Sequence, residues 1–137
     1  MVCCNRKKKI CPTGWHVPSG AAWTILIKYI YHTVSSTTIA QSTEAGRKLK
    51  AISATWVPSS GTDDYGFSAL PVGKRLDDGT YDYRGTQATF LSTTEDVSGK
   101  ALNRVLVDKD NTIYRLETDY YKGFGKSAGA YVRCLRD

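Results

Sequence analysis

The spacing of apolar residues changes once along the chain, near Trp56, and this change constrains the fold more than any other feature. Before that point, five apolar residues recur at helical spacing: Ala22, Trp23, Leu26, Ile27 and Ile30. After it, short apolar segments alternate with turn residues, which is typical of strands. Because the helical part precedes the strands and does not alternate with them, the sequence predicts an α+β fold.

Two helices are expected in the first half of the chain. Ser19 is a good N-cap, and the spacing beyond it predicts a helix from Gly20 to about Thr33 that packs Trp23 inward. The segment "TEAGRKLKAI" predicts a second, shorter helix, although Gly46 weakens this prediction. Its expected inner face consists of Ala45, Leu49 and Ile52.

Turn signals divide the second half into hairpins. "LDDGTY" at residues 76–81 carries an Asp-Gly hairpin signal. "VDKDNTIY" at residues 107–114 places a polar turn between "ALNRVLV" and "TIYRL", which are expected to pair as strands. "AYVRCLR" at residues 130–136 alternates and is expected to form the last strand.

Composition indicates one folded domain of ordinary size. The 137 residues are 41% hydrophobic and 23% charged, which disfavours disorder. The net charge of +6 comes partly from the run at residues 5–9, but elsewhere both signs are interspersed and no nucleic-acid motif occurs. We therefore expect no nucleic-acid partner.

Membrane insertion and secretion signals were also considered. The longest apolar run, "ILIKYIYHTV", is broken by Lys28 and His32 and is shorter than the roughly 20 residues of a transmembrane helix. The start "MVCCNRKKKI" has a basic stretch without the apolar region of a secretory signal. We expect no membrane span and no signal peptide in this chain.

Four cysteines, Cys3, Cys4, Cys11 and Cys134, lack the spacing of zinc sites, so no metal is expected from them. A bridge between Cys11 and Cys134 would close a loop around nearly the whole domain and contribute on the order of 4 kcal/mol. Free thiols remain an alternative, and four cysteines allow three pairings.

Several blocks of sequence carry a family resemblance. They are "CPTGWHVPSGAAWTIL", "GRKLKA", "GTDDYGFSALPVGKRLDDGTY", "TFLSTTED" and "SAGAYVRCLRD". In order and over nearly the whole chain from Cys11, they resemble the Fibrobacter succinogenes major paralogous domain. The resemblance implies a C-type-lectin-like fold of the formylglycine-generating-enzyme branch, with two helices packed on a small twisted antiparallel sheet. It also implies a domain at residues 11–137, preceded by a basic extension at residues 1–10.

The resemblance further implies that the chain ends are adjacent. Cys11 would lie beside the last strand, where Cys134 is its expected disulfide partner, and Trp15 and Trp23 would fill the core. His16 lies inside this motif and is expected to be a packed or hydrogen-bonded core residue, not a catalyst. The chain departs from the family pattern at Phe90, which precedes the Ser-Thr block where the family commonly has tryptophan.

Catalytic and metal signatures are weak. The sequence has no G-x-S-x-G elbow and no H-E-x-x-H pair. A formylglycine-generating enzyme needs a redox-active cysteine pair, whereas Cys11 and Cys134 are expected to be structural and a bridge between the adjacent Cys3 and Cys4 would be strained. The segment from Asp108 starts like a calcium loop, but Ile113 replaces its glycine. We expect no enzyme activity, no cofactor and no metal.

A binding surface is the remaining expectation. Seven of the 9 tyrosines follow position 60, and tyrosine is favoured in contact surfaces. The candidate ligand-binding residues are Glu95, Asp96, Asn103, Arg104, Tyr120 and Tyr121. The sequence thus predicts a non-catalytic recognition module of a bacterial surface or phage protein, located outside the cell, that binds a protein or glycan.

Three alternatives remain open. Related lectin-like domains serve as variable proteins of diversity-generating retroelements, and the composition of the second half is compatible with that role. An enzyme of the formylglycine-generating type is a second alternative, and a purely structural domain of a larger surface protein is a third.

Overall fold

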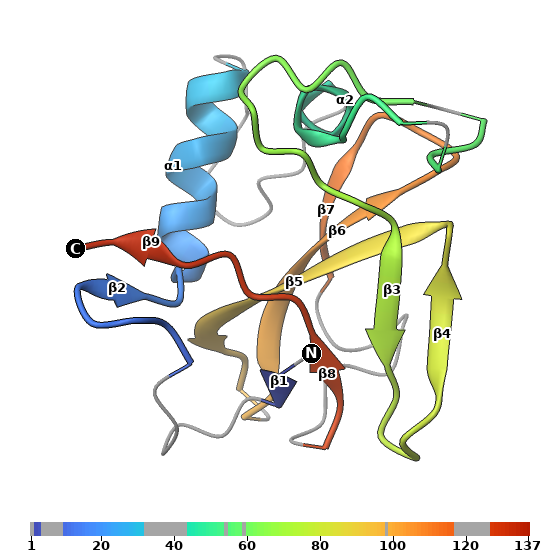
Figure 1. The fold of residues 1–137 in the computed structure, drawn as a ribbon. Helices are drawn as coiled ribbons and strands as arrows, with labels where there is room; N and C mark the ends of the chain where they lie inside the picture. The colour runs from blue at the N-terminus through green and yellow to red at the C-terminus, as the bar shows by residue number, and fades with distance from the viewer. Residues whose placement is uncertain are drawn as a thin grey trace.

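The computed structural model describes residues 2–3, 10–31, 44–53, 55–58, 60–97, 99–116 and 127–137. Its elements in chain order (Figure 1) are β1 (Val2–Cys3), β2 (Trp15–His16), α1 (Gly20–Ile30), α2 (Ala45–Leu49), β3 (Val72–Arg75), β4 (Tyr81–Arg84), β5 (Gln87–Glu95), β6 (Ala101–Val107), β7 (Ile113–Leu116), β8 (Gly129–Ala130) and β9 (Leu135–Arg136).

Seven of the described strands form one sheet. Its order is β1-β8-β3-β5-β6-β7, with β4 paired to β3 outside this path. β3 and β5 run parallel, and the other neighbours run antiparallel. Two helices with a mostly antiparallel sheet confirm the predicted α+β class.

α1 begins where the sequence predicts. The Ser19 hydroxyl accepts a hydrogen bond from the Ala22 amide at 3.1 Å, which satisfies one of the free amides at the helix start. The helix ends at Ile30, and the predicted end at Thr33 lies outside the described residues. Trp23 is buried, as expected.

The main core lies between α1 and one face of the sheet. The Trp23 ring packs against Phe67 and Phe90, with ring centroids 5.9 and 5.6 Å apart. Phe90 belongs to β5, and its neighbour Leu91 joins a second buried cluster with Ala130. Because successive residues of a strand face opposite sides, the two clusters mark the two faces of the sheet.

α2 is a single short turn with two of its three predicted inner residues buried. Ala45 and Leu49 are fully buried, but Ile52 is 77% exposed, so that part of the prediction is wrong. The chain becomes extended at Lys50, directly after the helix, and Ile52 therefore leaves the helical face. A Cβ at Gly46 would lie 2.5 Å from the Asn111 carbonyl oxygen, which explains a glycine inside this helix.

Both predicted hairpins are present. β3 and β4 pair antiparallel around a turn in which the Leu76 amide donates to the Thr80 carbonyl at 2.8 Å. β6 and β7 pair with Val105 opposite Tyr114. The predicted last strand at residues 130–136 is wrong as one element, because β8 and β9 belong to different sheets.

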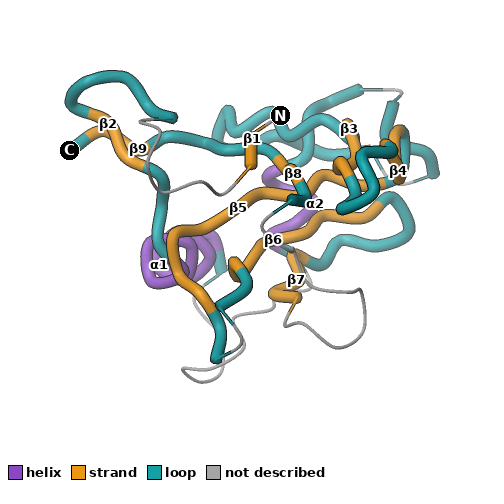
Figure 2. The backbone as a smooth tube through the Cα atoms, turned by 90° about the horizontal axis from the view of Figure 1, so that it is seen from below, coloured by secondary structure: helices purple, strands orange, loops and turns teal. Residues whose placement is uncertain are grey.

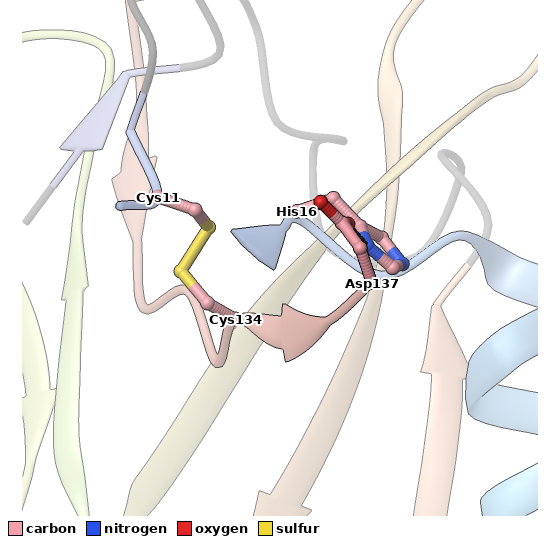
Figure 3. Close-up of polar contacts among 4 residues, drawn as sticks. All are labelled: Cys11, His16, Cys134 and Asp137. Atoms are coloured by element: carbon pink, nitrogen blue, oxygen red, sulfur yellow. Dashed lines mark hydrogen bonds and ion pairs between the residues drawn. A yellow bond between two sulfur atoms is a disulfide. The ribbon is translucent and has the colours of Figure 1, made fainter. Parts of the chain in front are cut away.

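The two ends of the described chain are joined. Cys11 and Cys134 form a disulfide with their Cα atoms 5.9 Å apart, as the resemblance implies. Nearby, β2 pairs with β9, and His16 Nδ1 shares a hydrogen bond of 2.6 Å with Asp137 Oδ1 (Figure 3).

This β2-β9 ribbon lies to one side of the main sheet (Figure 2). Its residues are consequently exposed: Trp15 is 45% exposed, and His16 is also on the surface. The expectations that Trp15 fills the core and that His16 is a core residue are wrong, although His16 is hydrogen-bonded. In the main sheet, β1 is the edge strand at the end opposite β7, and it pairs with β8. Val2 and Cys3, which belong to the expected 1–10 extension, therefore add a strand to this sheet.

Candidate ligand-binding cavity

A cavity of about 480 Å³ lies between the N-terminal half of α1 and strands β5, β6 and β7. Small-molecule sites commonly measure roughly 300 to 1,000 Å³, so this cavity has the size of a ligand site. Its walls are formed by Gly20, Ala21, Trp23, Thr24, Ile25, Lys28, Ser92, Thr94, Leu102, Asn103, Arg104 and Arg115.

The charges around the cavity have one sign. Lys28 on α1, Arg104 on β6 and Arg115 on β7 are cationic, and none of the wall residues that the structure describes is acidic. Cations gathered in a concave, partly desolvated site create a positive potential and attract anions.

Arg104 is the most deeply placed of these cations. Its side chain is only 3% exposed, and its Nη2 donates a weak hydrogen bond of 3.4 Å to the Thr24 hydroxyl. Nε and Nη1 of Arg104 have no hydrogen-bond partner in the part of the chain that the structure describes. Because Arg104 lies opposite Phe90 in the strand register, it shares the sheet face that α1 covers.

A second arginine faces the first. Arg115 lies directly opposite Arg104 in the β6-β7 register, and like charges at such positions repel. Burial, and secondly the charge of Arg115, lower the pKa of Arg104 to about 10, so its guanidinium is still protonated at neutral pH. A protonated, desolvated side chain with a like charge beside it is stabilised by an added anion.

Hydroxyl groups line the part of the cavity next to the start of α1. The Thr94 hydroxyl accepts from the Gly20 amide at 2.9 Å, and the Thr24 hydroxyl donates to the Gly20 carbonyl at 3.0 Å. The Gly20 and Ala22 amides at the start of α1 are therefore occupied, by Thr94 and by the Ser19 cap respectively. Apolar walls are supplied by Ala21, Trp23, Ile25 and Leu102.

The comparison with protein families identifies the chain. Residues 2–136 match the model of the Fibrobacter succinogenes major domain. The chain belongs to this family. No curated protein and no solved structure matches the chain. Because the match begins at residue 2, it includes β1 and the residues before Cys11, which the quoted sequence blocks left out.

The predicted contact residues of this major domain are not gathered at one place. Glu95 ends β5 on the surface, and Asp96 accepts the Lys100 amide at 3.0 Å in the turn before β6. Asn103 and Arg104 both line the cavity, but as neighbours on β6 their side chains face opposite sides of the sheet.

Tyr120 and Tyr121 lie outside the described residues. The contact patch that combines them with the four other residues therefore stays a prediction.

Most cavity residues of the major domain were not predicted as site residues, and Thr24, Lys28 and Arg115 are the ones that matter for the charge at Arg104. One sequence signal was sufficient to find Arg115. The turn at residues 108–112 fixes a register that sets Arg104 opposite Arg115, and cross-strand partners share a face. No comparable signal links Thr24 to Arg104, because they are 80 positions apart and meet only when α1 packs on the sheet.

The described part of the major domain contains no group of three or more His, Cys, Asp or Glu side chains that could hold a metal ion. Within the same residues, no helix is long and apolar enough to span a membrane.

Proposed function

We propose that this major domain is a non-catalytic recognition module that holds part of a protein or glycan ligand in the cavity beside α1. The observation that carries the proposal is Arg104, a buried guanidinium on the cavity wall whose Nε and Nη1 have no partner among the described residues. A buried charge that lacks an opposite charge disfavours folding, and a bound ligand would compensate for it. In this proposal, the buried charge of Arg104 lowers the stability of the free domain because it is reserved for binding a ligand.

The disulfide supports a binding role over catalysis of the formylglycine-generating type. Such chemistry needs a thiolate in a substrate groove, and Cys11 and Cys134 are bonded to each other. Neither sulfur belongs to the walls of the cavity. The side chains of Cys3 and Cys4 lie outside the described residues.

We further propose a C-type-lectin-like fold and a location outside the cell, on a bacterial surface or phage particle. Two helices on a mostly antiparallel sheet, with the chain ends joined, support the fold assignment. A disulfide supports the location, because disulfides persist in oxidising compartments.

The test is a binding screen with a blocked cavity. Ala21 is exposed and lies on the cavity wall, so Ala21→Trp should fill the cavity without disturbing the core. Lys109→Trp, an exposed position in the β6-β7 turn, is the matched control. We expect the wild-type domain to give hits on glycan arrays or immobilised surface proteins, and Ala21→Trp to weaken them at least tenfold.

The control Lys109→Trp should bind like the wild type. Hits that survive Ala21→Trp unchanged would refute the cavity as the binding site. Binding that is lost instead on changing Glu95 or Asp96 would assign the function to the β5-β6 turn.

A further inference from the structure

The cavity beside α1 presents many hydrogen-bond donors and few acceptors. Five N–H groups belong to a guanidinium, and on Arg104 the Nε and both Nη1 hydrogens are unused among the described residues. The Lys28 ammonium and the Thr94 hydroxyl also line the wall, and Thr94 has already accepted the Gly20 amide. A ligand group that only accepts hydrogen bonds and carries negative charge satisfies such a wall.

The form of the donors favours a carboxylate over a phosphate. Arginine presents a planar fork that matches the two oxygens of a carboxylate. Phosphate sites commonly add several free amides at a helix N-terminus, but two of the first three amides of α1, those of Gly20 and Ala22, are already bonded to Thr94 and Ser19. We therefore expect the ligand group at Arg104 to be a planar carboxylate.

The remaining walls favour a sugar ring over a peptide. Peptides are often read by pairing with a free strand edge. β6, which carries Arg104, has both edges occupied by β5 and β7, so at this end of the described sheet a peptide could pair only with the outer strand β7, one strand away from Arg104. The cavity instead offers threonine hydroxyls, Thr24 and Thr94, beside apolar walls from Ala21 and Ile25. A compact unit with hydroxyls, an apolar face and one acidic group matches these walls.

We propose that the cavity binds an acidic sugar unit, with the carboxylate of a uronic acid held by the Arg104 guanidinium. This inference rests on the proposed recognition function and specifies its ligand. Arg115 and Lys28 add positive charge around the same group.

Calorimetric titration of the whole chain with D-glucuronate tests the inference, with D-glucose as the neutral partner of the same ring. We expect saturable binding of glucuronate and at least tenfold weaker binding of glucose. Arg104→Met should weaken glucuronate binding at least tenfold. Arg104→Lys, which keeps the charge and loses the fork, should weaken it less.

The exposed variant Lys109→Met is the control and should bind glucuronate like the wild type. Equal affinity of the wild-type chain for glucose and glucuronate would overturn the inference. This comparison requires no variant. Tighter binding of inorganic phosphate, or of a tri-glutamate peptide, than of glucuronate would also overturn it.

The failure of this inference can be distinguished from failure of the proposed function. If glucuronate does not bind but Ala21→Trp still removes hits from the screen, the cavity binds a ligand of another class. If Ala21→Trp leaves every hit unchanged, the recognition function proposed for this cavity is wrong.

Discussion

Two of the buried cations that the structure describes, Lys50 and Arg104, lie in contrasting surroundings. Lys50 is fully buried, and its ammonium donates to the Asp110 carbonyl at 2.7 Å and lies 4.8 Å from the centre of the Trp56 ring. The carboxylates of Asp110 and Asp108 attract it. Arg104 is almost as buried, but within the described part of the chain its side chain makes one weak hydrogen bond, to a hydroxyl, and it faces another arginine.

The difference separates a structural cation from a binding cation. A buried charge that is well hydrogen-bonded and near opposite charges holds neighbouring segments together. A buried charge without such partners lowers stability and is free to interact with something outside the chain. By this comparison, Lys50 fastens α2 to the β6-β7 turn, whereas Arg104 is available to a ligand.

The largest expected effect is the loss of the Lys50 amino group and its contacts. Lys50→Met removes the ammonium from the Asp110 carbonyl and should lower the free energy of unfolding by about 3 kcal/mol. Urea denaturation measures this, with the exposed Lys109→Met as the control. If both variants unfold at the same urea concentration, Lys50 is not a structural cation and the comparison fails.

The tight packing around Lys50 gives the next effect. A Cβ at Gly61 would overlap the Lys50 backbone carbonyl, so Gly61→Ala must push the two segments apart. Gly85 has no atom near its Cβ position but has a φ of +86°, so Gly85→Ala incurs backbone strain of only about 1 kcal/mol. Thermal unfolding should therefore show the larger loss for Gly61→Ala. Equal losses would mean that the segments separate easily.

At Arg104 we expect a substitution to increase stability instead of lowering it. Replacing a poorly compensated buried charge with an apolar side chain is often stabilising, and Arg104→Met should raise the free energy of unfolding by about 1 kcal/mol. Arg104→Lys retains the charge and should show no such gain. A marked loss of stability in Arg104→Met, measured in the same urea series without ligand, would show that Arg104 is structural.

The smallest effect is in the alkaline pH dependence. Burial lowers the pKa of Lys50 below its usual 10.5, although Asp110 and Asp108 partly oppose this shift. Between the lowered pKa and 10.5 the unfolded chain binds more protons, so the contribution of Lys50 to stability rises with pH in that window. Relative to Lys50→Met, the wild type should become more stable as pH approaches 10.5. A relative decrease there would contradict the direction of the shift.

Local features of the fold were readable from the sequence, and features set by distant contacts were not. Ser19 and Trp23 were predicted correctly because a cap and a helical face depend on neighbouring residues. Trp15 was expected in the core from the family resemblance, yet the β2-β9 ribbon that carries it lies to one side of the main sheet and Trp15 is 45% exposed. Ile52 was misplaced because α2 ends at Leu49.

In the cavity, too, features that depend on distant contacts could not be predicted from the sequence. Arg104 was predicted as a contact residue, but its burial beside Thr24 depends on α1 crossing β6 and was not visible in the sequence. Its pairing with Arg115 was within reach of the hairpin signal. Tyr120 and Tyr121 fall outside the described residues, and their place in the contact surface stays a prediction.

The bond between Cys11 and Cys134 has a mechanical consequence. These residues are 123 positions apart, and the bond links the two segments through which the chain enters and leaves the fold. A pulling force applied to residues 10 and 135 would pass through the sulfur atoms, and the helices and the sheets between them would bear almost none of it. A domain tethered in this way keeps its cavity intact under shear that would extend an unbridged one.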